Sequence, residues 1–225
     1  MGTLYILASP IGNMQDLSFR AVQTLKNADI IYCEDTRVSK NLLNHYNIER
    51  KVLRSLNART EKAKINELLR ELKSGKQVVY MSDAGTPGIS DPGANLVHSA
   101  RKAGFSVVPI PGPSAFVAAL SASGIFAHHF VFYGFLPQKK GRQSLLKQIA
   151  KDSKVSVFYE SKHRIMKFLR EFQEYAPSKQ ICLARELTKI HEEFLYGTAQ
   201  ELIDTLEQNP QKQKGEFVVI MYDKQ

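Results

Sequence analysis

Residues 77–93 read QVVYMSDAGTPGISDPG, and this stretch indicates the fold. Its first five residues form an apolar run typical of a buried strand, and the segment that follows it, ANLVHSARKAG, has the periodicity of a helix. The connection between them holds three glycines and two prolines, which is more than a plain turn needs. A strand, a loop and a helix in this order predict an α/β protein, and we interpret the loop as functional rather than as a long structural connection.

The two aspartates of this loop are predicted to have different roles. Asp83 follows the strand end, where its carboxylate can reach a ligand hydroxyl or amine. Asp91 precedes Pro92, which is the pattern of an N-cap followed by proline at the first helical position. The loop contains no lysine and its first charged residue is acidic, so we do not interpret it as a phosphate cradle.

Strand-like and helix-like runs alternate along the rest of the chain, which predicts the α/β class. The predicted strands are residues 4–8, 30–34, 51–55, 77–81 and 105–110, followed by 129–135, 154–160, 180–186, 191–197 and 215–222. Helices are predicted to begin after Asp16 and Ser161, and at Thr198 with a capping box. Gly75 and Gly104 are predicted helix stops.

The segment PIPGPS, residues 109–114, interrupts this alternation with three prolines and a glycine. We therefore predict two α/β domains, residues 1–110 and 111–225, joined by a short, stiff connection. A single continuous sheet is the alternative.

Composition favours a polyanionic partner. The net charge is +9, from 31 Lys and Arg against 22 Asp and Glu, and the pI is near 9.5. A positive excess of this size is typical of proteins that bind nucleic acid, although a solvated basic surface would give it too. The apolar runs are too short to span a membrane, and the N-terminus lacks the basic region of a signal peptide. Cys33 and Cys182 fit a reducing cytoplasm, so we expect a cytoplasmic protein without a membrane partner.

Several familiar sites are missing from the sequence. There is no dinucleotide-binding G-x-G-x-x-G after the first strand, no phosphate-binding P-loop and no G-x-S-x-G nucleophile elbow. The six histidines show no metal-ligand spacing, so no metal site is predicted. Instead, the apolar strands repeatedly run into Gly, Pro, Ser and charged residues, which predicts that their ends form the rim of one ligand cleft.

The sequence resembles the tetrapyrrole methylase superfamily of S-adenosylmethionine-dependent methyltransferases. Within it, the chain is similar to the ribosomal RNA methyltransferase I family, the bacterial small-subunit (16S) rRNA cytidine 2′-O-methyltransferases. The resemblance covers nearly the whole chain. It rests on SPIGN (9–13), EDTR (34–37), SDAGTPGISDPG (82–93), PGPSA (111–115), YGFLP (133–137), FYES (158–161), ARELTK (184–189) and KGE (214–216), in this order.

The resemblance implies two α/β domains with S-adenosyl-L-methionine in the cleft between them, and a homodimer. It implies methylation of a cytidine ribose 2′-hydroxyl in the decoding region of 16S rRNA, with the RNA or the 30S subunit as partner. Many members continue past the last strand with an extra segment, whereas this chain ends at Gln225, so we interpret it as a short or a trimmed member. By position in these motifs, the implied cofactor-binding residues are Pro10, Ser82, Asp83, Ala84, Pro87, Ile89, Ser114, Ala115, Tyr159, Leu183, Ala184 and Gly215.

Methylation of a ribose hydroxyl calls for a base or a cation near its oxygen, because the hydroxyl is a poor nucleophile at neutral pH. The strand ends offer Glu34 or Glu160 as the base, and Arg37, Arg185 or Lys189 as partners of phosphate or alkoxide. Asp35 and Glu186 are further members of the same motifs. The alternative is an internal ion-pair network, such as Glu34 with Arg185, that only fixes the site.

For the RNA itself, the stretch FLPQKKGRQ places Phe135 beside Lys139, Lys140 and Arg142, which suits a loop that binds phosphates. Two other functions stay open at this point: a methyltransferase of a tetrapyrrole or another small molecule, and a non-catalytic RNA-binding or ribosome-assembly factor.

Overall fold

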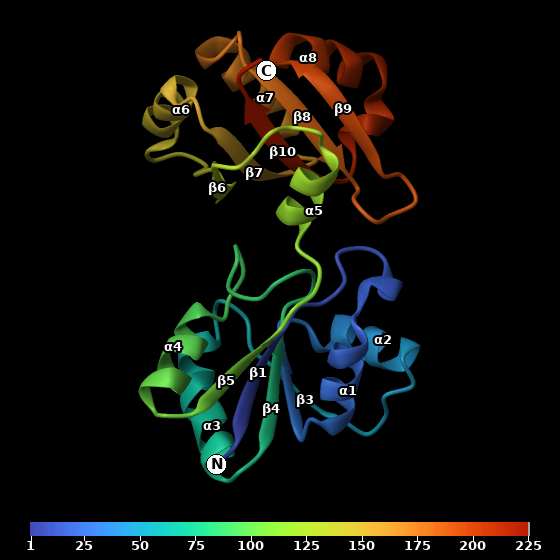
Figure 1. The fold of residues 1–225 in the computed structure, drawn as a ribbon, viewed down its shortest axis with the longest axis vertical. Coiled ribbons are helices and arrows are strands. Elements are labelled where there is room, and N and C mark those ends of the chain that lie inside the picture. The colour runs from blue at the N-terminus through green and yellow to red at the C-terminus, as the bar shows by residue number, and fades with distance from the viewer. Residues whose placement is uncertain (225) are drawn as a thin grey trace. The chain divides into compact units, whose positions relative to one another are not determined.

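The computed structural model describes residues 1–224 and divides the chain into two compact units, Met1–Ser114 and Ala115–Gln225 (Figure 1). Each unit contains one five-stranded sheet with its own core. The predicted α/β class is therefore confirmed.

The first unit is built on a parallel sheet with strand order β3-β2-β4-β1-β5. Each strand before β5 is followed by a connection that crosses back over the sheet, as parallel pairing requires. The strands are β1 (Thr3–Leu7), β2 (Ile30–Cys33), β3 (Val52–Ser55), β4 (Gln77–Met81) and β5 (Ser106–Ile110). The helices are η1 (Met14–Asp16), α1 (Phe19–Asn27), α2 (Thr36–His45), α3 (Glu61–Lys73) and α4 (Ala94–Lys102).

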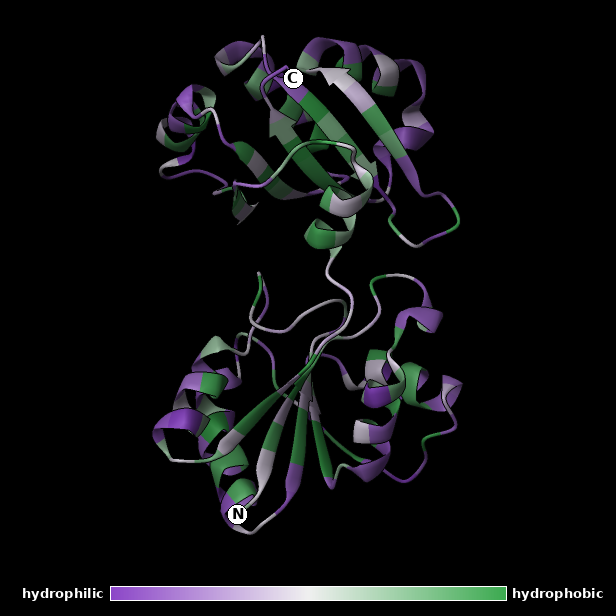
Figure 2. Ribbon diagram, viewed as in Figure 1, coloured by the Kyte–Doolittle hydropathy of each residue, from purple (hydrophilic) through white to green (hydrophobic). Residues whose placement is uncertain are grey.

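Helices cover both faces of this sheet: α1 and α2 pack on one face, and α3 and α4 on the other (Figure 1). Successive residues of β4 alternate between the two layers, since Val79 packs with the α1 and α2 core and Val78 and Tyr80 with the α3 and α4 core. Burial on both faces explains why the strands read as nearly continuous apolar runs (Figure 2).

The second unit has strand order β6-β7-β10-β8-β9, in which only β6 and β7 pair in parallel. Its strands are β6 (Phe130–Phe135), β7 (Val155–Ser161), β8 (Gln180–Arg185), β9 (Glu193–Thr198) and β10 (Glu216–Tyr222). Its helices are α5 (Ala115–Ala122), α6 (Arg142–Lys151), α7 (Ile165–Tyr175), α8 (Ala199–Gln208) and η2 (Pro210–Gln213). The register places the ends of β7 and β8 and the starts of β9 and β10 along one edge, since Glu216 pairs with Ser161, Phe217 with Arg185, and Arg185 with Glu193.

All ten predicted strands are present, with ends that differ by at most two residues. The capping box at Thr198 and the helix stops at Gly75 and Gly104 are confirmed. The predicted starts at Asp16, Ser161 and Asp91 are wrong. They are replaced by Ser18 before α1, Arg164 before α7 and Gly93 before α4.

Candidate active site

The ends of β1, β2, β4 and β5 lie at one edge of the first sheet because these strands are parallel neighbours. The loops after β1 and β4 are joined by a pair of backbone hydrogen bonds between Ser9 and Gly85, at 2.9 and 3.0 Å. Ser9 Oγ also donates to the carbonyl of Ser82 (2.9 Å), and Ser82 Oγ donates to the carbonyl of Gly85 (3.0 Å). The loop that follows β4 is therefore held in place at its first residues.

The loop after β5 approaches the same edge closely. A Cβ on Gly112 would lie 3.0 Å from Ala8 Cβ and 3.1 Å from the Ala8 carbonyl, so a side chain does not fit there without a shift. Thr86 Oγ1 donates to the carbonyl of Pro113 (3.1 Å), which ties this loop to the one after β4. Predicted cofactor residues lie in these loops. Those of the first unit are Pro10, Ser82, Asp83, Ala84, Pro87, Ile89 and Ser114.

Three carboxyl groups, those of Glu34, Asp83 and Asp91, gather at this edge, and none of them forms a salt bridge within residues 1–224. The backbone N–H of Asp83 donates to Glu34 Oε1 (3.3 Å), and the backbone N–H of Asp35 donates to Asp83 Oδ1 (3.0 Å). Burial, followed by the charge of Asp91, raises the pKa of Glu34 to about 7. Burial and the charge of Asp83 raise the pKa of Asp91 to about 6, and burial also raises the pKa of Asp83. When ionised, these carboxyl groups favour a positively charged ligand.

Tyr80 adds a polar atom to this region. Its hydroxyl is buried and has no hydrogen-bond partner among the described residues. Burial and then the charges of Glu34, Glu61, Asp91 and Asp83 raise the pKa of Tyr80.

The role predicted for Asp91 belongs to Glu61 instead. Glu61 Oε1 accepts from the backbone N–H groups of Gly93 (3.1 Å) and Leu96 (3.3 Å), and Oε2 accepts from Asn95 Nδ2 (3.0 Å). A carboxylate from the start of α3 thus caps the start of α4, while Asp91 stays with Glu34 and Asp83. Sequence reasoning missed Glu61 because it lies some thirty residues before the helix that it caps.

Arg37 points away from this group of carboxylates. Its side chain is 88% exposed and binds Asp35, the N-cap of α2, with 2.7 Å between Arg37 Nη2 and Asp35 Oδ2. Hydrogen bonds from the side chain and backbone of Arg37 lower the pKa of Asp35 to about 2.

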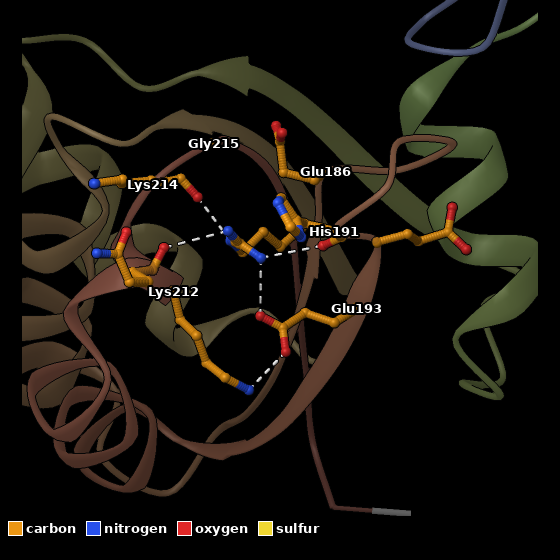
Figure 3. Close-up of a pocket in the computed structure, with 9 residues that line it drawn as sticks. Glu186, His191, Glu193, Lys212, Lys214 and Gly215 are labelled. Carbon is orange, nitrogen blue, oxygen red and sulfur yellow. Dashed lines mark hydrogen bonds and ion pairs between the residues drawn. The ribbon is translucent and has the colours of Figure 1, made fainter.

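Three predicted residues of the second unit, Arg185, Lys189 and Gly215, lie at the edge where β8 ends and β9 and β10 begin. A pocket of about 610 Å³ lies there (Figure 3). Its lining residues are Arg185, Glu186, His191, Glu192, Glu193, Gln211, Lys212, Lys214 and Gly215.

Arg185 is the central structural residue of this pocket. Its guanidinium donates to Glu193 Oε1 (3.1 Å) and to the carbonyls of Lys214 (2.7 Å), His191 (3.1 Å) and Gln211 (3.3 Å). Lys212 Nζ neutralises the second oxygen of Glu193 at 2.7 Å. Arg185 thus has a carboxylate partner, Glu193, within its own unit.

Lys189 and Gly215 belong to a second cluster at this edge. Lys189 Nζ contacts Glu186 Oε1 (3.0 Å) and Glu216 Oε2 (2.8 Å). Glu186 Oε1 also accepts from the backbone N–H of Glu216 (2.9 Å). Gly215 has φ +107°, and a Cβ there would lie 2.5 Å from the Glu186 side chain, so only glycine fits.

The other predicted residues of this unit lie on the sheet and its connections. Tyr159 and Ala184 are strand residues, and Leu183 is buried in the helix-facing core. Ala115 begins α5. The Glu160 side chain has no exposed surface; its Oε1 accepts from the Ser161 backbone (2.8 Å) and from Arg164 Nε (2.9 Å).

The predicted RNA-binding residues divide into two groups. Lys139 and Lys140 are exposed, and their ammonium groups have no partner within residues 1–224. Arg142 is buried: its Nε contacts both carboxylate oxygens of Glu171 (3.0 and 2.9 Å), and its Nη1 donates to the carbonyl of Pro137 (2.9 Å). Arg142 therefore anchors the loop that carries the two lysines.

Within the described part of the chain, no group of three or more His, Cys, Asp or Glu is placed to hold a metal ion. Among the helices of residues 1–224, none has the length and apolar character needed to cross a membrane.

Comparison with known proteins decides the family. A family model described as Tetrapyrrole (Corrin/Porphyrin) Methylases matches residues 3–203. A relative from Thermotoga maritima, named Ribosomal RNA small subunit methyltransferase I, is 44% identical over 225 residues, which cover 100% of both chains. The chain belongs to the tetrapyrrole methylase family. The Haemophilus influenzae protein of the same name is 45% identical and longer, with 99% of this chain matching 79% of its length.

Solved structures of tetrapyrrole methylases share the fold. Cobalt precorrin-4 methyltransferase, a cobalamin biosynthetic enzyme, has a TM-score of 0.73 at 17% identity, over 98% of this chain and 94% of its own. Uroporphyrin-III C-methyl transferase from Thermus thermophilus, complexed with S-adenyl homocysteine, has a TM-score of 0.67 at 18% identity, over 98% and 97%. The predicted family is confirmed, and the chain is an S-adenosylmethionine-dependent methyltransferase.

Proposed function

We propose that this methyltransferase acts on the ribose 2′-hydroxyl of a cytidine in the decoding region of 16S rRNA. The observation that carries the proposal is the 44% identity, over the full length of both chains, to a protein named Ribosomal RNA small subunit methyltransferase I. The net charge of +9 supports a nucleic acid substrate, because a small acidic ligand needs only a few local cations. The structural neighbours that act on tetrapyrroles make a tetrapyrrole the alternative substrate to test.

The residues at the carboxyl edge of the first sheet fit S-adenosylmethionine. Its sulfonium and ammonium groups are cationic, and Glu34, Asp83 and Asp91 form a cluster of carboxyl groups that, when ionised, complements a cation; burial is the main cause of their raised pKa values. The close approach of Gly112 to Ala8 packs the loop after β5 against the end of β1, which fixes the edge where we place the cofactor. We propose that Pro10, Asp83, Ala84, Pro87 and Ile89 line this part of the site. In the second unit, we propose that the cofactor-binding residues are Ala115, Tyr159, Ala184 and Gly215.

When bound, S-adenosylmethionine supplies an electrophilic methyl group that an oxygen nucleophile takes by in-line displacement. In this reaction the 2′-oxygen forms a bond to the methyl carbon, the sulfur–methyl bond breaks, and the hydroxyl proton must leave. We propose Glu34 as the group that takes the proton, because its pKa of about 7 suits proton exchange at neutral pH. Arg185 and Lys189 are bound to carboxylates, so we propose that they fix the edge of the second sheet.

Substitution of Glu34 tests its role as the base. Glu34→Gln is expected to lower methyl transfer by about 100-fold or more, the usual contribution of a general base, and to weaken cofactor binding by a smaller factor because it also removes one carboxylate of the cluster. Calorimetry with S-adenosylmethionine measures binding, and transfer of labelled methyl groups to small ribosomal subunits measures turnover. Unchanged turnover in Glu34→Gln would remove Glu34 as the base.

We further propose a cytoplasmic homodimer, in keeping with its ribosomal substrate. Exposed apolar side chains such as Val117 and Phe130 of the second unit support an interface between two copies. Light scattering on the purified protein measures the mass; a monomer at micromolar concentration would contradict the dimer.

A further inference from the structure

Phe135 and Arg164 form a platform at the end of β6. Phe135 is an apolar side chain with 50% of its surface exposed. The Arg164 guanidinium lies over its ring, with 5.5 Å between Arg164 Cζ and the ring centroid, and Tyr159 packs at 5.7 Å. An exposed aromatic ring beside a guanidinium plane offers two surfaces on which a nucleobase can stack.

Glu160 holds Arg164 in this position. The distance between Arg164 Nε and Glu160 Oε1 is 2.9 Å, and the carboxylate is fixed in turn by the Ser161 backbone N–H at 2.8 Å. The Arg164 side chain remains 24% exposed, and its Nη groups have no hydrogen-bond partner within the described chain. A buried carboxylate therefore orients a guanidinium whose outer nitrogens are available to a ligand.

The surroundings of the platform are basic. Lys139 and Lys140 are exposed on the loop that follows Phe135, and Lys162 is exposed between Glu160 and Arg164. The loop is anchored at its far end, where Arg142 is buried against Glu171 and the carbonyl of Pro137. Cations beside a stacking surface complement a single-stranded nucleic acid, whose phosphates run alongside its bases.

We propose that Phe135 and Arg164 stack an unpaired nucleobase of the RNA substrate, while Lys139 and Lys140 contact its phosphates. This inference rests on the proposed function, and it assigns Glu160 as a positioning residue for Arg164 instead of the catalytic base. The occupant is single-stranded RNA, because a duplex buries its base faces and offers them no contact.

Binding of a single-stranded RNA oligonucleotide that carries 2-aminopurine tests the platform in the full-length protein. Stacking is expected to quench 2-aminopurine fluorescence, and Phe135→Ala is expected to weaken binding about tenfold and to abolish the quenching. Phe135→Ala should leave the slope of log affinity against log salt concentration unchanged. The double variant Lys139→Ala with Lys140→Ala should make this negative slope shallower by about 1.4, or about 0.7 for each lost phosphate contact. Phe135→Leu keeps the apolar volume and should lose the quenching as well.

Control variants separate stacking from misfolding and from failure of the proposed function. Phe19→Ala removes an aromatic ring that is 94% exposed in the first unit, and it should change neither affinity nor quenching. Glu160→Gln should reduce quenching with an unchanged salt slope. If the wild-type protein methylates small subunits and Phe135→Ala binds RNA as tightly as wild type, the proposed platform is wrong and the proposed function stands. Wild-type protein that neither methylates nor binds RNA would overturn the proposed function.

Discussion

Glu34 shows how one half-buried carboxyl group links the site to stability. Burial and Asp91 raise its pKa to about 7, above the ordinary value of 4.5. The folded state therefore binds more protons than the unfolded state between these pH values, so the group's contribution to stability is fully present below pH 4.5 and is lost as the pH rises through 7.

We therefore expect Glu34→Gln to gain stability relative to wild type as the pH rises. The difference in free energy of unfolding between variant and wild type should increase by about 1–2 kcal/mol from pH 4.5 to pH 8, a value reduced for solvent screening. Urea unfolding at several pH values measures this difference. A difference independent of pH would mean that the pKa of Glu34 is not raised.

Cofactor binding should depend on pH for the same reason. Since a cationic ligand prefers ionised carboxylates, the dissociation constant for S-adenosylmethionine is expected to fall as the pH rises from 5.5 to 8, through the pKa values of Asp91 and Glu34. Calorimetry in buffers with different ionisation enthalpies should also detect proton release on binding. Binding that is equally tight at both pH values would count against the carboxylate cluster as part of the cofactor site.

Some residue roles could be predicted from the sequence, and others depended on tertiary contacts. The position of Asp83 after the β4 strand end follows from the apolar run before it, and the structure places it beside Glu34. Asp91 was misassigned because its local pattern with Pro92 fits an N-cap, while the distant Glu61 supplies the cap. Arg142 lies among lysines in the sequence, and only the fold shows that it is buried against Glu171.

At the scale of elements, the junction of α3 and α4 holds the loop of residues 82–93. Glu61→Ala is expected to lower the free energy of unfolding by about 2 kcal/mol, because it leaves the capped N–H groups without their acceptor. Hydrogen exchange should accelerate at the amides of Gly93 and Leu96. If the exchange rates of these two amides do not change, Glu61 is not their cap.

The connection between β6 and α6 depends on a buried ion pair. Arg142→Ala removes the partner of Glu171, so we expect a loss of about 3–5 kcal/mol in the free energy of unfolding. Lys140→Ala, a change in the same loop at an exposed position, is the matched control and should leave the unfolding midpoint unaltered. Equal midpoints for the two variants would contradict an anchoring role for Arg142.

The positions of the strands could be predicted from the sequence more accurately than their pairing. Strands such as β4 are buried on both faces, so they can be recognised in the sequence as apolar runs. The pairing of strands was less accessible: the mixed sheet of the second unit depends on β10 pairing with β7 and β8, contacts more than thirty residues apart. No local pattern encodes such a register.

At the scale of the whole molecule, the central claim is methyl transfer to a ribose 2′-hydroxyl of small-subunit RNA. The most direct measurement incubates the protein with labelled S-adenosylmethionine and undermethylated small ribosomal subunits, then digests the RNA with alkali. We predict label in an alkali-resistant dinucleotide that begins with cytidine, because a 2′-O-methyl group blocks cleavage at that ribose. Label that appears only in mononucleotides, or only in a tetrapyrrole offered in parallel, would contradict the account.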